Sequence, residues 1–199
     1  MKIDFLGTSG VDAALLGLGL SYGLTSEYSS MYYVPEETKK RLYQIAGKLA
    51  RKGGGEDKFL RQIVYWWDVK APRFWFAEAD TYKVATTAQS ESTMHTIMHR
   101  ELTQEDFEYD ISLFQLDYLN RLIAKYKETK SEEAFLKLKN GLPEGFLQRR
   151  VWSLSLANMK NIYHQRKRHR LPQWKLVCQA FVDATPGFLQ GIYDEADKG

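Results

Sequence analysis

The spacing of apolar positions predicts a chain built mainly of helices. Apolar residues recur every three or four positions over 11–22, which is typical of one buried helix face. Pro35-Glu36-Glu37 predicts the start of a second helix, because proline suits the first turn and acids suit the positive end of the helix dipole. Similar patterns predict helices over 58–65, 103–127, 131–139 and 156–168, a short helix opened by Pro72, and a last helix that begins at Pro172.

A few extended segments complete the pattern. Residues 2–6 alternate enough to form an edge strand, and residues 65–69 and 146–153 are also predicted to be extended. Residues 81–93 follow an aromatic run over 73–76 but show no period, so we expect a loop there. The predicted class is therefore α+β: mostly helical, with a small central antiparallel or mixed sheet.

Length and composition narrow the class of protein. A chain of 199 residues with 44% hydrophobic content suits a single globular domain over 1–199, which two small lobes could also build. The single cysteine, Cys178, excludes an intramolecular disulfide framework and fits a reducing compartment. The longest apolar stretch near the start, residues 11–20, is too short to span a membrane, and no secretory signal is evident. We therefore expect a cytoplasmic protein.

Two charged or titratable patterns are candidates for chemistry. His95 and His99 could share one helix face as metal ligands, but no third ligand is indicated, so we favour a structural or surface role and predict no metal site. The basic run over 166–170 is either a solvated surface or an anion site for nucleotide phosphate or nucleic acid. Nucleic acid is disfavoured because the net charge is only +3. Arg149 and Arg150 would extend the run if the strand and the helix are neighbours.

The order of several segments resembles the flavin-dependent thymidylate synthases over roughly residues 3–190. The segments that carry the likeness are FLGTSGVDAALLGLGLSYGLTS, IAGKLARKGGGEDKFLRQIVYW, LKNGLPEGF and LANMKNIYHQRKRHRLPQWKLVCQAF. Each segment is weak alone, and their order and spacing together carry the case. The resemblance implies methylation of dUMP with FAD, a folate carbon donor and NADPH, in a homotetramer that shares its sites between subunits.

The family's signature is replaced in this chain. The family has Arg-His-Arg, seven residues and then Ser, where this chain has Asp80-Thr81-Tyr82, seven residues and then Ser90. The histidine of the family's Gly-His turn falls on Gly54. Because an aspartate and two hydroxyls cannot supply the cationic flavin contacts, we expect the family reaction to be impaired or absent.

The resemblance also assigns individual residues. The family's catalytic arginine precedes the Pro-Gln-Trp segment, where Arg166, Arg168 and Arg170 compete, and we favour Arg168. The remaining nucleotide positions are Gln89, Ser90, Ser92, Lys139, Arg166 and Arg170, and the cofactor positions are Asp80, Thr81, Tyr82, Asn158, Lys160 and His164.

Three functions follow from these observations. The first is a divergent flavin-dependent enzyme that methylates a pyrimidine nucleotide or transfers a related one-carbon group. The second is a nucleotide-binding protein of the same fold without redox chemistry. The third is an unrelated helical nucleic-acid-binding protein that uses the basic run.

Overall fold

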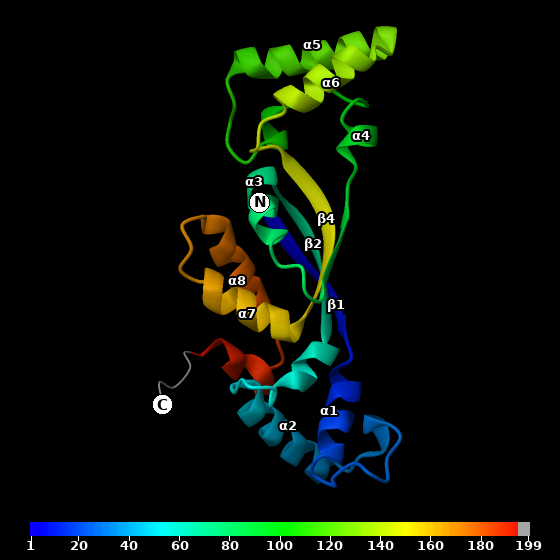
Figure 1. Ribbon diagram of the computed structural model, residues 1–199, viewed down its shortest axis with the longest axis vertical. Coiled ribbons are helices and arrows are strands. Elements are labelled where there is room, and N and C mark those ends of the chain that lie inside the picture. Colours follow the sequence, from blue (N-terminus) through cyan, green and yellow to red (C-terminus); the bar gives the residue numbers. More distant parts are fainter. Residues whose placement is uncertain (195–199) are drawn as a thin grey trace. The chain divides into compact units, whose positions relative to one another are not determined.

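The computed structural model describes residues 1–194 of the chain, which form eight α-helices, four strands and short 3-10 helices (Figure 1). The strands are β1 (Lys2–Ser9), β2 (Val64–Pro72), β3 (Thr86–Ser90) and β4 (Leu147–Ser155). The α-helices are α1 (Val11–Leu20), α2 (Glu36–Ala50), α3 (Arg73–Ala79), α4 (Thr93–Thr96), α5 (Leu113–Thr129), α6 (Glu132–Gly141), α7 (Leu156–Arg166) and α8 (Pro172–Ala184). The 3-10 helices are η1 (Met31–Tyr33), η2 (Lys58–Gln62), η3 (Gln104–Asp106) and η4 (Gly187–Tyr193). No helix within the described part of the chain is long and apolar enough to cross a membrane.

The four strands form one sheet in the order β1-β2-β4-β3, so β1 and β3 are its edges. The backbone hydrogen bonds show an antiparallel arrangement: β2 and β4 are joined between residues 63 and 156 and between 73 and 146, and β4 and β3 between residues 155 and 85 and between 149 and 91. The Leu156 N–H donates to the Ile63 carbonyl at 2.8 Å, and the Arg73 N–H donates to the Phe146 carbonyl at 3.1 Å. This confirms the predicted class of helices with a small antiparallel sheet.

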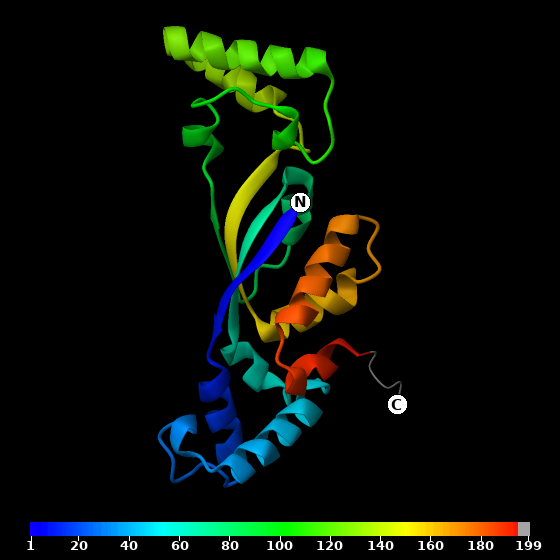
Figure 2. The same ribbon diagram turned by 180° about the vertical axis from the view of Figure 1, so that it is seen from behind.

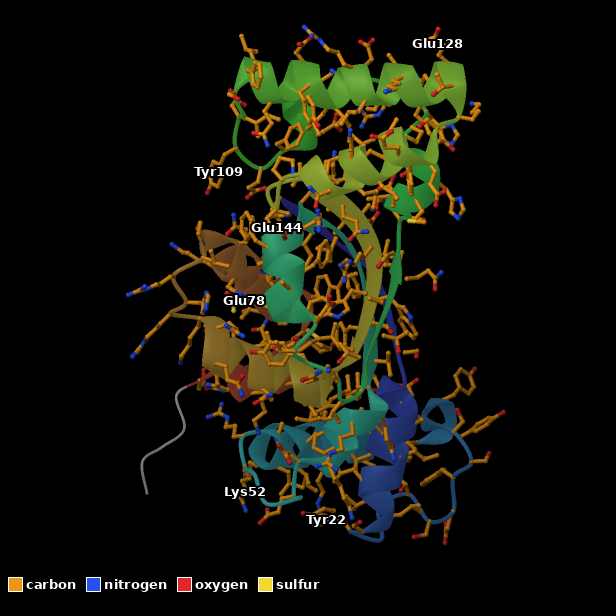
Figure 3. All side chains as sticks on the ribbon, turned by 45° about the horizontal axis from the view of Figure 1, so that its top comes forward. Tyr22, Lys52, Glu78, Tyr109, Glu128 and Glu144 are labelled. Carbon is orange, nitrogen blue, oxygen red and sulfur yellow. The ribbon has the colours of Figure 1, made fainter. Side chains whose placement is uncertain are left out.

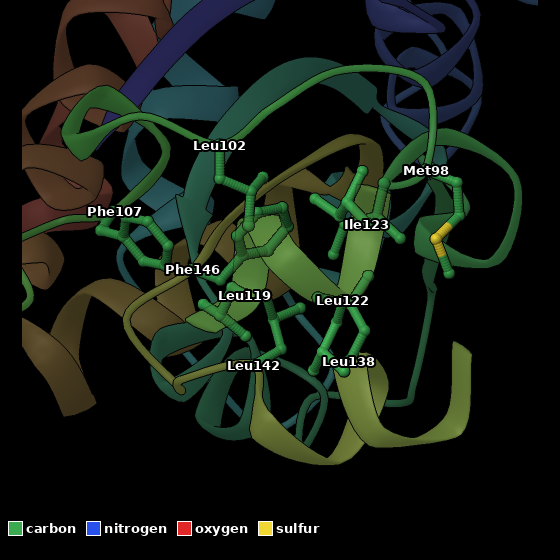
Figure 4. Packing of buried hydrophobic residues seen from close by; sticks show 10 residues of the cluster. Met98, Leu102, Phe107, Leu119, Leu122, Ile123, Leu138, Leu142 and Phe146 are labelled. Carbon is green, nitrogen blue, oxygen red and sulfur yellow. The ribbon is translucent and has the colours of Figure 1, made fainter. Parts of the chain in front are cut away.

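The chain divides into two compact units, and each strand contributes residues to both. Unit 1 contains Met1–Lys2, Asp68–Tyr82 and Ala88–Val151. In it, α5 and α6 lie side by side, as both ribbon views show (Figures 1 and 2). Its apolar cluster joins these helices to the segments around them (Figure 4). The cluster consists of Ile97, Met98, Leu102, Phe107, Leu119, Leu122, Ile123, Leu138, Leu142 and Phe146.

Unit 2 contains Ile3–Trp67, Lys83–Thr87 and the chain from Trp152 onward. Its centre is aromatic: the Phe181 ring on α8 lies 5.3 Å from Trp67 and 6.3 Å from Trp152, measured between centroids. Leu15 on α1 and Leu42 on α2 are also fully buried. Burying large side chains of this kind stabilises a fold by about 1.5–3 kcal/mol each. Leu15 and Leu42 therefore mark the faces of α1 and α2 that pack into unit 2.

Two local predictions were wrong, and both errors have a physical reason. Residues 86–90, predicted as loop, form β3; most of their side chains are exposed, so no alternating pattern marks a strand whose backbone pairs with β4. The helix predicted over 103–127 begins only at Leu113. Thr103 and Asp106 do form a capping box, but it closes a single 3-10 turn.

Candidate functional site

Asp80, the first residue of the replaced signature, lies at the end of α3 and pairs with Arg150 on β4. The Arg150 Nη1 donates to the two carboxylate oxygens of Asp80 at 2.8 and 3.1 Å, and its Nε donates to Gln148 Oε1 at 3.1 Å. The guanidinium carbon also lies 3.9 Å from the centroid of the Phe76 ring. The charge of Asp80 is therefore neutralised within unit 1 by an arginine that sequence analysis did not assign to this position.

Thr81 and Tyr82 complete the end of α3. The Thr81 hydroxyl donates to the Glu78 carbonyl at 2.7 Å, and the Tyr82 N–H donates to the Ala79 carbonyl at 3.1 Å. Figure 3 labels Glu78 on this helix. The polar groups of this segment thus terminate a helix, since the last carbonyls of α3 have no partner within it.

The nucleotide positions of unit 1 lie on β3 and just after it. Gln89 and Ser90 are exposed on the edge strand, and Ser92 is the N-cap residue of α4. Lys139 on α6 donates to the Thr93 hydroxyl at the start of α4. Burial lowers the pKa of the Lys139 ammonium, and the nearby Arg73 guanidinium lowers it further. The structure thus brings Lys139 beside the helix that Ser92 starts.

Asn158 and Lys160 lie on α7 in unit 2, and each joins α7 to another segment. The Asn158 side-chain amide donates to the Val84 carbonyl at 3.0 Å and to the Thr86 hydroxyl at 3.2 Å. The Lys160 ammonium donates to the carbonyls of residues 50 and 52 at 2.7 and 2.6 Å, and to the Asp57 carboxylate at 2.8 Å. Since an ammonium has three N–H donors, those of Lys160 are all in use.

The remaining predicted residues lie at the end of α7 and in the connection to α8. The His164 Nε2 is 2.8 Å from the Ile192 carbonyl oxygen, which joins α7 to η4. The Arg166 guanidinium lies 5.0 Å from the centroid of the Trp174 ring. Arg168 and Arg170 are exposed in the α7–α8 connection. The basic run therefore presents two exposed guanidinium groups to solvent.

These contacts do not fit the flavin dinucleotide that the resemblance implies. A dinucleotide pyrophosphate requires cations or free N–H donors, and position 80 supplies a carboxylate. Apart from His164, Lys160 is the basic residue among those predicted to bind the cofactor. Two of its N–H groups donate to the carbonyls of residues 50 and 52, at and just after the end of α2. Both amide hydrogens of Asn158 are engaged with residues 84 and 86. The residues assigned to the cofactor therefore do not offer a site for its pyrophosphate.

Arg149 and Arg150, which could have extended the basic run, are paired with carboxylates of unit 1 instead. The Arg149 Nε donates to Asp68 Oδ1 at 2.9 Å, and its guanidinium lowers the pKa of Asp68 through this hydrogen bond. Sequence showed two adjacent arginines but gave no signal for these partners, which lie 81 and 70 positions away.

His95 and His99 are both exposed and line a hollow of about 390 Å³ in unit 1. The other lining residues are Met94, Met98, Tyr126, Lys127 and Lys130. Among residues 1–194, no cluster of three or more His, Cys, Asp or Glu side chains could hold a metal ion.

Comparison with known proteins gives a likeness of fold. No protein-family model and no curated sequence matches the chain. A crystal structure of thymidylate synthase X from Helicobacter pylori with FAD and dUMP matches with a TM-score of 0.74 and 13% sequence identity, covering 100% of both chains. A second structure of the Helicobacter pylori flavin-dependent thymidylate synthase with FAD and dUMP has the same score and identity, covering 98% of this chain and 99% of that one. The chain therefore has the fold of these flavin-dependent thymidylate synthases.

Proposed function

We propose that this protein binds a pyrimidine nucleotide of the dUMP type. The observation that carries the proposal is the likeness of fold over the full chain to structures that contain FAD and dUMP. The exposed guanidinium groups of Arg168 and Arg170 support it, because a guanidinium binds phosphate oxygens through paired N–H donors. We assign Arg168 to the nucleotide and, in the expected homotetramer that shares its sites between subunits, we assign Ser90 and Gln89 to hydrogen bonds with a nucleotide.

One-carbon transfer to the pyrimidine is the second candidate function. The presence of both FAD and dUMP in the solved structures of this fold favours it. The contacts of Asp80 and Lys160 oppose it. Position 80 is a carboxylate that pairs with Arg150, and the Lys160 ammonium is engaged with Asp57, so neither residue offers flavin a free positive charge. Visible absorption separates the two functions: a purified protein that stays colourless after incubation with FAD and dialysis excludes the flavoenzyme.

Thermal unfolding with added dUMP tests nucleotide binding. A ligand at one hundred times its Kd stabilises the folded state by about 2.7 kcal/mol, which is a rise in Tm of about 5–11 °C for a chain of this size. Arg168→Ala and Ser90→Ala should each reduce this rise, whereas Arg61→Ala, at an exposed position of η2, should not. Equal stabilisation of all three variants would refute the site assignment.

The same experiment tests the nucleic-acid alternative. If an oligonucleotide stabilises the protein, dUMP does not, and added salt removes the effect steeply, then the basic run binds a phosphate backbone.

Sedimentation tests the expected homotetramer with sites shared between subunits. A protein that stays monomeric and still binds dUMP would hold a complete site in one chain.

A further inference from the structure

A second concave site lies between α2 and η4, both in unit 2. This α2–η4 cleft has a volume of about 640 Å³, within the range of small-molecule sites. It is lined by Tyr43, Gln44, Gly47, Lys48, Arg51, Lys52, Gly187 and Phe188. None of these residues is among those that the resemblance assigns to nucleotide or cofactor, and none of them is acidic.

One wall of the cleft is aromatic. The rings of Tyr43 and Phe188 lie 4.5 Å apart between centroids and are tilted by 31°, and both side chains are half-buried. Gly47 allows the backbones to come this close, because a Cβ built there would lie 2.7 Å from the Phe188 carbonyl oxygen. Because residue 47 has no side chain, η4 lies close enough for the Phe188 ring to pack against Tyr43 on α2, and both residues line the cleft.

Three cationic side chains line the cleft beside these rings: Lys48, Arg51 and Lys52. Lys52, labelled in Figure 3, follows the end of α2. Arg51 lies against Gly191, where a Cβ would be 2.4 Å from the guanidinium Nε, so the glycine makes room for the arginine.

The carboxylates near these cations leave them able to bind another anion. The Arg51 guanidinium is 3.4 Å from Asp194, and both side chains are 62% exposed. The Lys52 ammonium is 2.8 Å from Glu56, and these two are 57% and 52% exposed. Exposed ion pairs are weak, so a phosphate can displace either carboxylate.

A simpler explanation is that the basic side chains at the end of α2 interact favourably with the negative end of its helix dipole. That explanation accounts for Lys48 in the last turn. It requires neither a cleft nor an aromatic pair on the same surface. Cations beside aromatic rings instead match a ligand that has a flat ring and a negative group.

We propose that the α2–η4 cleft binds a nucleoside monophosphate, with the base against Phe188 and Tyr43 and the phosphate against Lys48 and Arg51. The cleft is a site additional to the nucleotide site proposed above and does not depend on it. The cleft recognises the base and the phosphate of the ligand together, so a nucleoside alone or phosphate alone should bind more weakly.

Amide NMR shifts with AMP, adenosine and inorganic phosphate test the proposal. AMP should shift amides over 43–52 and 187–191, and adenosine and phosphate should each bind at least about tenfold more weakly. Equal affinity for phosphate alone would mean an adventitious ion only and would overturn the proposal. The absence of AMP-induced shifts in these segments would also overturn it.

Variants separate this cleft from the nucleotide site of the proposed function. Lys48→Gln, at an exposed position, should weaken AMP binding at least about fivefold, and Arg51→Gln should weaken it further. Lys40→Gln, at a 69% exposed position of the same helix, is the matched control and should bind AMP as the unmodified protein does. Arg168→Ala should leave the AMP-induced shifts in the cleft unchanged, even if it removes dUMP binding. Wild-type AMP affinity in Lys48→Gln would refute the proposed phosphate contact.

Discussion

Replacing Lys160 by methionine should lower the free energy of unfolding by about 3 kcal/mol, because its ammonium satisfies several groups at once. It donates to the Asp57 carboxylate, to the carbonyl of Ala50 at the end of α2, and to the carbonyl of Lys52 just beyond it. The Lys160 and Asp57 side chains are only 17% and 21% exposed, so water replaces these contacts poorly.

The magnitude follows from these contacts. Removing one partner of a buried ion pair costs about 3–5 kcal/mol, and a hydrogen bond to a charged group is worth about 1.5–3 kcal/mol. Since Lys160 and Asp57 retain some exposure, the lower part of the first range applies. Methionine keeps most of the apolar stem, so packing contributes little to the difference.

Urea unfolding of the purified protein measures the effect. Lys160→Met should lower the midpoint without changing the slope, and Lys40→Met, at a 69% exposed position, should change stability by less than about 0.5 kcal/mol. In a double-mutant cycle with Asp57→Asn, the two changes should cost less together than the sum of their separate costs. A change below about 1 kcal/mol for Lys160→Met would refute this reasoning. If Lys160 instead contacted a cofactor, the variant would lose ligand while its unfolding free energy stayed the same.

Three further predictions concern other parts of the chain. Gly47→Ala should lower the free energy of unfolding in urea by about 1–3 kcal/mol, because its Cβ would lie 2.7 Å from the Phe188 carbonyl oxygen; this outweighs the higher helix propensity of alanine. Gly53→Ala, whose Cβ would meet nothing within 4 Å, is the control. Burial raises the pKa of the Cys178 thiol to about 11, so a thiol reagent at pH 8 should label it only after unfolding, and rapid labelling of the folded protein would contradict its burial. Burial alone would raise the pKa of Asp106, but the Arg100 guanidinium and a backbone N–H lower it below its usual range. This carboxylate therefore stabilises the fold above the ordinary carboxyl pKa of about 3.9 and loses that contribution as the pH falls through its folded pKa, so Asp106→Asn should flatten the acid side of the stability profile.

The candidate site was only partly readable from sequence. The seven-residue spacing to Ser90 and the basic run were visible in the chain, and both led to assignments that ligand binding can test. The partner of Asp80 was not visible, because Arg150 lies 70 positions away and faces it only once β4 has formed. Lys160 matched a family position by sequence, but its contacts with residues 50, 52 and 57 depend on where α2 ends.

The sequence by itself determined the helices and the strands that carry a local signal. Apolar period, capping residues and proline act over a few positions, so α1, α2, α7 and α8 could be predicted from them. Tertiary structure alone decided β3, an exposed edge strand defined by backbone pairing rather than by side-chain pattern. It also decided which charges are neutralised and which stay exposed, because ion-pair partners are set by the approach of segments far apart in the chain. For that reason the chemistry of residues 80–82 became clear only from the fold, which pairs Asp80 with Arg150 and turns Thr81 back onto α3.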